Sequence, residues 1–277
     1  MDGKSVAGRI HDLNDQLTAS GRKAARGLLG NYPLLGLAPV AEFAEAAGVS
    51  AASIVRFVAQ LGFKSYPEFQ RALRDELEQR SKSPLQRGAA PDGEPSDGAF
   101  LARYLHQAQT RLADTLRHIP ESEFEAVAMR LASGKGACYM MGGRFTDFLA
   151  GYFEAHMRVI RPGLRRFDGR PATRADQLLD VRAGDMAILF DVRRYDPVVA
   201  DVAAVLARHR VDIVLITDEW LSPAARHARY VLPCHTQTGR AWDANGALFS
   251  VVEALIARVT EQSWSTASKR MRAVEDL

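Results

Sequence analysis

The sequence predicts two domains of different fold class, an all-helical domain over residues 1–80 and a doubly wound α/β domain over residues 99–277. Before residue 81, apolar residues recur at helical steps of three and four. After residue 98, short apolar runs alternate with amphipathic helical patterns, as in a parallel sheet covered on both faces. Residues 81–98 are rich in Pro, Gly, Ser and charge, which predicts a linker between the two.

The bulk properties are those of an ordinary protein without a membrane segment. A net charge of +3 over 277 residues permits a nucleic-acid partner without arguing for one. Cys138 and Cys234 lie in separate apolar runs, which is typical of buried thiols and not of a disulfide or a metal site. No apolar run approaches the roughly 18 residues of a membrane span. We therefore expect a cytoplasmic protein with no cofactor and no metal ion.

Five helices are predicted in the first domain. The apolar residues Val6, Ile10, Leu13 and Leu17 share one face of the first helix. Pro33 should end the second helix, because a proline disfavours helical geometry in the residue before it. A third helix is expected over residues 40–47, a fourth over residues 51–61 with Ser50 as its cap, and a fifth from Ser65 to about Arg80, where Ser65 and Glu68 have capping-box spacing.

The third and fourth helices, joined by Gly48-Val49-Ser50, have the spacing of a helix-turn-helix. Small residues at the start of the fourth helix allow close approach to a DNA groove, Arg56 suits guanine or phosphate, and Gln60 can reach a base edge. The predicted DNA-binding residues are Ser50, Ala51, Ala52, Ser53, Arg56, Gln60, Lys64 and Ser65. From spacing alone, a plain helical hairpin with a solvated polar face is an equally good interpretation.

The residues themselves resemble the RpiR/MurR-type transcriptional regulators. The resemblance lies in residues 40–50 (VAEFAEAAGVS), residues 53–57 (SIVRF) and residues 61–66 (LGFKSY). It covers nearly the whole helical domain, and it implies a winged-helix-like helix-turn-helix domain that binds DNA, followed by a sugar-isomerase (SIS) domain that binds a carbohydrate derivative.

The second domain fits that implication. Helices are expected over residues 99–118 and 121–133, and strands over residues 137–141, 165–167, 186–190, 213–217 and 230–233. We expect five parallel strands in the flavodoxin-like order 2-1-3-4-5, which the resemblance to SIS domains implies.

Ligands of such sheets bind beyond the carboxyl ends of the strands at the switch point, here between the first and third strands. The two loops at this point precede helices and carry three arginines, which suit a carboxylate or phosphate. The predicted ligand-binding residues are Gly142, Gly143, Arg144, Thr146, Arg193, Arg194, Tyr195 and Asp218. Alternatively, Arg193 or Arg194 pairs with Asp191, Asp196 or Asp218 and braces the loops. Residues 235–245 are expected to close over the pocket.

These loops depart from the family pattern. SIS domains that bind sugar phosphates usually carry hydroxyl side chains here, whereas this chain has Arg144 and Phe145 in the first loop and Arg193-Arg194-Tyr195 in the second. An acidic metabolite, a nucleotide and no ligand at all are therefore open alternatives to a phosphosugar.

The sequence favours a DNA-binding regulator that senses a small anionic metabolite over an enzyme. The alternatives are an isomerase, with His156, His235, Glu154 or Glu253 as its base, and a SIS domain that serves only to dimerise. No paired acid and base stands out. We expect a homodimer or a dimer of dimers on a palindromic operator, with residues 99–118 and 244–260 as interface helices.

Overall fold

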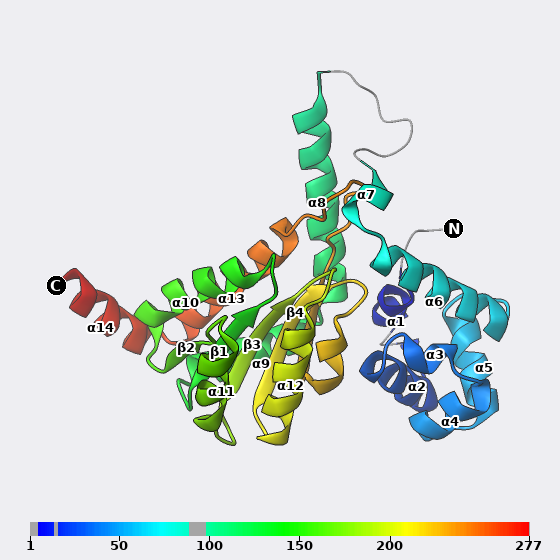
Figure 1. The fold of residues 1–277 in the computed structure, drawn as a ribbon, viewed down its shortest axis with the longest axis horizontal. Helices are drawn as coiled ribbons and strands as arrows, with labels where there is room; N and C mark the ends of the chain where they lie inside the picture. Colours follow the sequence, from blue (N-terminus) through cyan, green and yellow to red (C-terminus); the bar gives the residue numbers. More distant parts are fainter. Residues whose placement is uncertain (1–4, 14–15, 89–97, 277) are drawn as a thin grey trace.

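The computed structural model describes residues 5–13, 16–88 and 98–276. Every regular element described before residue 89 is a helix (Figure 1). The helices are α1 (Val6–Leu13), α2 (Ala19–Gly30), α3 (Leu34–Leu37), α4 (Val40–Ala47), α5 (Ala51–Gln60), α6 (Tyr66–Ser81) and α7 (Pro84–Arg87). Helix α4 has the predicted bounds, and α5 ends one residue earlier than predicted. The break predicted at Pro33 is confirmed, because α2 stops at Gly30 and the short α3 follows it.

Two details of this region differ from the predictions. The first predicted helix extended to Leu17, whereas α1 ends at Leu13; residues 14 and 15 lie outside the described residues, and Leu17 is nevertheless buried in the same core. Helix α7 lies inside the predicted linker, where Ser83 and Gln86 form a capping box that starts it. Residues 89–97 of that linker also lie outside the described residues.

The second region is a five-stranded, all-parallel sheet in the order β2-β1-β3-β4-β5, which confirms the predicted fold class and strand order. The strands are β1 (Cys138–Gly142), β2 (Leu164–Arg166), β3 (Met186–Asp191), β4 (Asp212–Asp218) and β5 (Tyr230–Cys234). The helices are α8 (Phe100–His118), α9 (Glu121–Ala132), α10 (Asp147–Ile160), α11 (Pro171–Leu179), α12 (Pro197–Arg208), α13 (Gly246–Gln262) and α14 (Trp264–Glu275). Helix α14 was not predicted.

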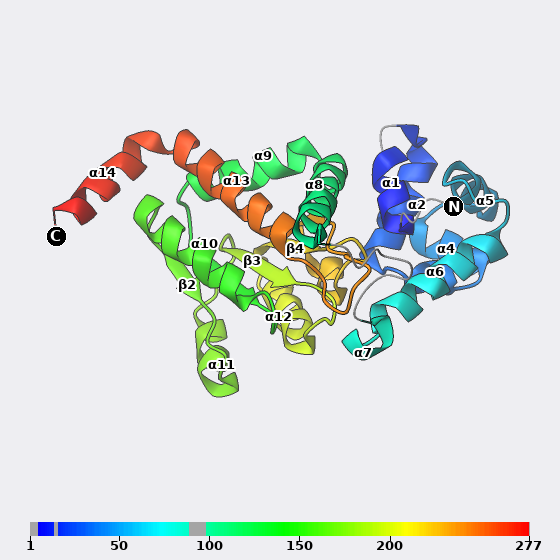
Figure 2. The same ribbon diagram turned by 90° about the horizontal axis from the view of Figure 1, so that it is seen from above.

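The helices cover both faces of the sheet (Figure 2). Alternate strand residues point to opposite faces. Cys138 and Met140 of β1 join a core with α9, α10 and α13, whereas Tyr139 and Met141 join a second core with α11 and α12. The carboxyl ends of β1 and β3 are consequently held firmly from both sides. Within the described residues, no helix is long and apolar enough to cross a membrane.

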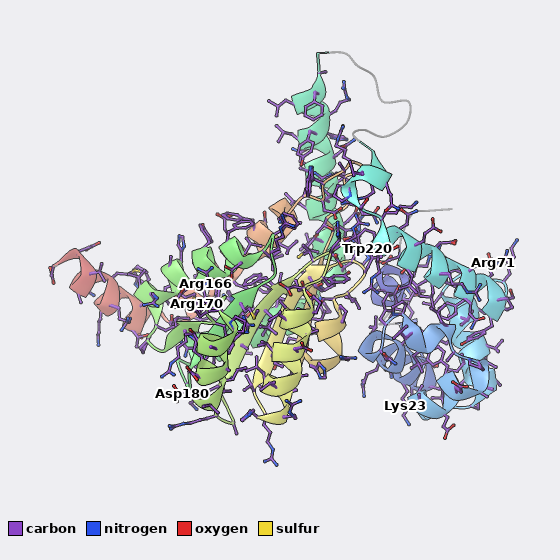
Figure 3. All side chains as sticks on the ribbon, viewed as in Figure 1. Lys23, Arg71, Arg166, Arg170, Asp180 and Trp220 are labelled. Atoms are coloured by element: carbon purple, nitrogen blue, oxygen red, sulfur yellow. The ribbon has the colours of Figure 1, made fainter. Side chains whose placement is uncertain are left out.

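The helical region packs against the loop that follows β4 (Figure 1). Leu221 of that loop is buried in the apolar core of the helical region. Ser5 Oγ donates a hydrogen bond of 3.1 Å to the carbonyl oxygen of Glu219, and Arg80 Nη2 donates one of 3.2 Å to that of Leu221. In Figure 3, Trp220 lies where the sheet meets the helical region. The carboxyl edge of the sheet is therefore directly connected to α6.

Candidate functional site

Helix α5 presents a continuous outer face. Seven of the eight residues predicted to bind DNA are exposed, and Ser53 is half-buried. The inner face carries Ile54, Phe57 and Val58, each at most 1% exposed, and the Phe57 ring meets that of Phe43 edge-on at 6.5 Å. The outer face is thus mounted on a rigid core. Val55, which is 51% exposed, also lies on this face and was missed, although its place one residue before Arg56 is visible in the helical period.

Local hydrogen bonds set the ends of α5 and α6. Gly48 adopts a left-handed conformation (φ 63°) that ends α4 and lets the chain turn. Ser50 Oγ accepts a hydrogen bond of 3.2 Å from the backbone N–H of Ser53, and Ser65 Oγ accepts one of 3.3 Å from that of Glu68. Arg56 Nη2 donates to Ser53 Oγ at 3.1 Å. Two of the predicted contact residues, Ser50 and Ser65, therefore also position the helices that they begin.

Further exposed cations lie on the neighbouring helices α2 and α6. Lys23 on α2 and Arg71 on α6 are exposed and point away from the helical core (Figure 3). The start of α2 lies beside the end of α5, because a Cβ added to Gly21 would come within 3.5 Å of Gln60 Oε1. The prediction centred on α5 missed these flanking cations.

The first loop at the switch point turns tightly after β1. A Cβ on Gly142 would lie 2.4 Å from the backbone nitrogen of Asp147, so only glycine fits there. Thr146 Oγ1 accepts from the Gly143 N–H at 3.0 Å and donates to the Phe190 carbonyl at 2.8 Å. The buried Thr146 side chain therefore ties this loop to β3. Arg144, in contrast, is exposed and lies over the Phe145 ring at 5.0 Å.

Asp218 lies underneath the second loop and is fully buried. Its Oδ2 accepts a 2.7 Å hydrogen bond from the Arg193 N–H, and its Oδ1 accepts one of 2.6 Å from the Tyr195 hydroxyl. Burial raises the pKa of Asp218, and burial together with the Asp218 carboxylate raises the pKa of Tyr195 well above its ordinary value. Asp218 consequently supports the loop from below.

The Arg193 side chain is buried and bound to other parts of the protein. It is 4% exposed and forms a bidentate pair with Asp243, with Nε–Oδ2 at 2.9 Å and Nη2–Oδ1 at 2.5 Å. Its Nη1 donates to the Gln79 carbonyl at 3.0 Å, and its guanidinium stacks on Trp220 at 4.0 Å. The expectation that an arginine braces this loop is therefore met by Arg193, but the partner is Asp243 and not Asp191, Asp196 or Asp218. Arg194 is exposed.

Two cavities flank Arg144. One, of about 670 Å³, contains four arginines and two carboxylates together with aromatic side chains. Its lining includes Arg87, Arg144, Arg193, Arg194, Tyr195, Asp196, Asp243, Phe145, Phe148 and Trp242. The other, of about 780 Å³, is lined by four arginines and four carboxylates, and it takes in Gly142 and Gly143. We call them the cationic cavity and the balanced cavity. Thr146 and Asp218 line neither.

Residues of the 235–245 loop close one side of the cationic cavity, as the sequence predicted. The Trp242 ring meets that of Phe145 edge-on at 5.7 Å, and Asn245 Nδ2 donates to the Phe145 carbonyl at 3.1 Å. Asp243, which also belongs to the 235–245 loop, forms ion pairs with Arg87 and Arg193.

Further buried carboxylates lie below these loops. Burial raises the pKa of Asp191 to about 7, although Ser222 Oγ and the Asp196 N–H donate hydrogen bonds to it. Burial, and then the charge of Asp218, raises the pKa of Glu219 to about 7. Within the described residues, no group of three or more His, Cys, Asp or Glu is placed to hold a metal ion.

The residues weighed as an isomerase base share no cavity, although Glu253 and His156 both contact Tyr152 of α10. Glu154 pairs with Arg158 along α10, and Glu253 accepts a hydrogen bond from Tyr152. His235 lies at the other side of the domain against His118, with ring nitrogens 3.1 Å apart. Burial, followed by the charge of His118, lowers the pKa of His235 to about 4. These residues do not converge on one cavity.

Comparison with known proteins follows the two-region division. Residues 4–80 match the rpiR-family helix-turn-helix domain, and residues 131–258 match the SIS domain. A protein of Providencia stuartii described as an HTH-type transcriptional regulator is 23% identical over 236 residues, which cover 84% of this chain and 81% of that protein.

Two solved structures share the fold. The sugar isomerase domain of an RpiR transcription factor from Sphaerobacter thermophilus has a TM-score of 0.60 and 21% identity, over 65% of this chain and 99% of that one. Vibrio vulnificus NanR, solved with ManNAc-6P, has a TM-score of 0.54 and 16% identity, over 98% of this chain and 97% of that one. With an rpiR-family helix-turn-helix domain in front of a SIS domain, the chain belongs to the RpiR-type transcriptional regulators.

Proposed function

We propose that this protein binds specific DNA through the outer face of α5 and regulates transcription in response to a small anion bound in the cationic cavity. The observation that carries the DNA half is the helix-turn-helix itself, since α4, the Gly48 turn and α5 present the predicted contact residues on one exposed face. A recognition helix of this kind reads base edges with the residues near its start.

The roles within this surface follow from position and chemistry. Arg56 and Gln60 can pair with base edges, and exposed Val55 can contact a thymine methyl group. Lys64 and Ser65 lie just beyond the helix, where they can hold the phosphate backbone. Lys23 and Arg71 add positive charge that strengthens binding to any sequence.

The charge of the two cavities favours the cationic cavity as the effector site. Four arginines face only two carboxylates in the cationic cavity, whereas the balanced cavity has equal numbers. An anion therefore gains more in the cationic cavity. The aromatic walls of Phe145, Phe148 and Trp242 suit the apolar face of a sugar or another ring. The ManNAc-6P bound by NanR is one anion of this kind, and it makes a sugar phosphate one candidate among carboxylates and nucleotides.

We also propose that the protein acts as at least a dimer. Helix α8 carries a stripe of apolar residues, Leu101, Leu105, Leu112 and Leu116, which are 39–74% exposed. In Figure 1, α8 projects beyond the sheet. A sedimentation experiment on wild type and Leu105→Glu tests this, and a wild-type monomer at micromolar concentration would contradict it.

The DNA half is tested by selecting binding sites from a random duplex library. We expect the wild type to enrich one sequence, and Arg56→Ala to lose about 5- to 100-fold in affinity for it while its binding to random DNA changes less. Arg208→Ala, which removes an exposed arginine from α12, is the matched control and should bind like the wild type. Failure of the wild type to enrich any sequence would refute the assignment.

A further inference from the structure

Asp243 sits in the cationic cavity in the manner of a bound anion. Arg193 grips its carboxylate with two hydrogen bonds, and Arg87 Nη1 donates a third to Oδ1 at 2.8 Å. The side chains of Arg193, Asp243 and Arg87 are 4%, 8% and 12% exposed. An arginine fork supplemented by a second arginine is an arrangement by which proteins recognise a bound phosphate or carboxylate.

This cluster carries more positive charge than one carboxylate neutralises. Two guanidinium groups face one carboxylate, so the cluster is left with a positive charge in a nearly dry place. Arg87 Nε is buried and has no hydrogen-bond partner among the described residues. Exposed Arg144 and Arg194 line the same cavity. A phosphate, with three acceptor oxygens and up to two charges, would satisfy these donors better than Asp243 does.

The same arginines are connected to the DNA-binding domain. Arg193 Nη1 holds the carbonyl of Gln79, which belongs to the last turn of α6, where helix carbonyls lack partners of their own. Arg87 belongs to α7, which follows α6 almost directly. Helix α6 begins at Tyr66, shortly after α5, and buries Phe69 and Leu73 in the core of the helical region. It thus links the cavity to the recognition helix as one rigid element.

We propose that Asp243 is an internal counter-ion that occupies the anion site, and that the phosphate of the effector displaces it from Arg193 and Arg87. This inference rests on the cationic cavity being the effector site. Among the described residues, the Arg193 guanidinium contacts Asp243, Gln79 and Trp220, so an anion reaches its fork only when Asp243 leaves. Its departure breaks the bridge by which Asp243 joins Arg193, the residue that holds the Gln79 carbonyl at the end of α6, to Arg87 of α7.

Inorganic phosphate tests this with the full-length chain. The apparent affinity for an anion equals the intrinsic affinity multiplied by the fraction of molecules in which Asp243 has left the site. We therefore expect Asp243→Asn to bind phosphate at least about tenfold more tightly than the wild type, as measured by calorimetry. Asp212→Asn is the matched control, because Asp212 also pairs with two arginines, Arg130 and Arg229, at the opposite end of the sheet. Its phosphate affinity should equal that of the wild type.

A second readout follows the connection to α6. Amide hydrogen exchange in residues 76–81 should speed up in the wild type saturated with phosphate, and equally in Asp243→Asn without phosphate. If Asp243→Asn does not fold, Arg87→Gln replaces it and should bind phosphate about tenfold less tightly than the wild type.

The results separate this inference from the proposed function. The counter-ion role of Asp243 is overturned if folded Asp243→Asn binds phosphate no more tightly than the wild type. It is also overturned if neither the wild type nor Asp243→Asn binds phosphate, or if Arg87→Gln binds it with unchanged affinity. If the selection of DNA sites nevertheless succeeds, the DNA half of the proposed function stands although the counter-ion inference has failed. Failure of the DNA selection refutes the DNA assignment and leaves the phosphate result unaffected.

Discussion

The helix-turn-helix and the switch-point loops use arginine in opposite ways. Arg56 on α5 is exposed, and among the described residues its guanidinium hydrogen-bonds only to Ser53 Oγ of its own helix. Arg193 is buried and contacts Asp243, Gln79 and Trp220, which come from three distant parts of the chain. The first arginine is ready for an external partner, whereas the second already has internal ones.

This difference shows what each region contributes. A surface whose side chains are free can bind DNA without rearrangement of the protein. A site whose arginines already have internal partners must exchange one partner for another. Such an exchange can be transmitted to the elements that those arginines hold. Arg193 holds the end of α6, so the cavity has a direct route to the DNA-binding domain.

The largest expected effect on stability distinguishes the two arginines, Arg193 and Arg56. Arg193→Ala leaves Asp243 buried with Arg87 as its remaining partner, so we expect a loss of about 3 kcal/mol in the free energy of unfolding. Arg56→Ala removes an exposed side chain and should change it by less than about 0.5 kcal/mol. Urea denaturation of both variants measures the difference. Equal stabilities would mean that the Arg193 pair is not formed in solution.

A second prediction concerns the pH dependence of the helical region. Glu76 accepts hydrogen bonds from the Val6 N–H at 2.6 Å and from the Tyr32 hydroxyl, and burial raises its pKa to about 7. Because the folded pKa lies above the ordinary value, the folded state binds more protons, and stability is lost as the pH rises from about 4.5 to 7.

Glu76→Gln lacks this titration. Part of the Glu76 side chain reaches solvent, so we expect the difference in unfolding free energy between variant and wild type to shift by about 2 kcal/mol in favour of the variant between pH 4.5 and pH 8. Unfolding curves at the two pH values provide the measurement. A difference that does not change with pH would show that Glu76 keeps an ordinary pKa.

The fold and the exposed face of α5 were predictable because both depend on local periodicity. Apolar runs such as residues 186–190 placed the strands within about two residues, and doubly covered strands imply the parallel sheet. Likewise, the apolar residues of α5 determine which residues face outward, so the exposure of Arg56 and Gln60 follows from their spacing.

The switch-point site was less predictable because its partners are far apart in the sequence. Asp243 lies 50 residues and Gln79 114 residues from Arg193, and no local pattern connects them. Thr146 and Asp218 were predicted from their loops alone, yet their side chains support those loops from inside. Loop residues at a switch point thus divide into those that face the ligand and those that hold the loop, and only tertiary contacts distinguish them.

A third and smaller effect on stability concerns the cap that positions α5. Ser50→Ala removes the side-chain cap of α5 and should lower the free energy of unfolding by about 1 kcal/mol. Ser50→Thr retains a capping hydroxyl and should recover most of the loss. Thermal unfolding of the two variants is the measurement. If alanine and threonine behave alike, the hydroxyl does not cap the helix, and its remaining role is contact with DNA.

The smallest effect on stability comes from Arg144, the exposed arginine that borders both cavities. Arg144→Ala should change the free energy of unfolding by less than about 0.5 kcal/mol. It should nevertheless weaken phosphate binding about fivefold, because it removes a charged donor from the cationic cavity. Differential scanning calorimetry measures the stability of each sample, and titration calorimetry on the same samples measures the phosphate affinity.

Arg174 is the matched comparison for Arg144, because it lines only the balanced cavity and donates to the carbonyls of Asp168 and Gly169. We expect Arg174→Ala to bind phosphate like the wild type. If instead Arg174→Ala loses affinity and Arg144→Ala does not, the anion binds in the balanced cavity. Asp243 would then be only a structural partner of Arg193 and Arg87, and the contrast between a free DNA surface and an internally occupied effector site would have to be abandoned.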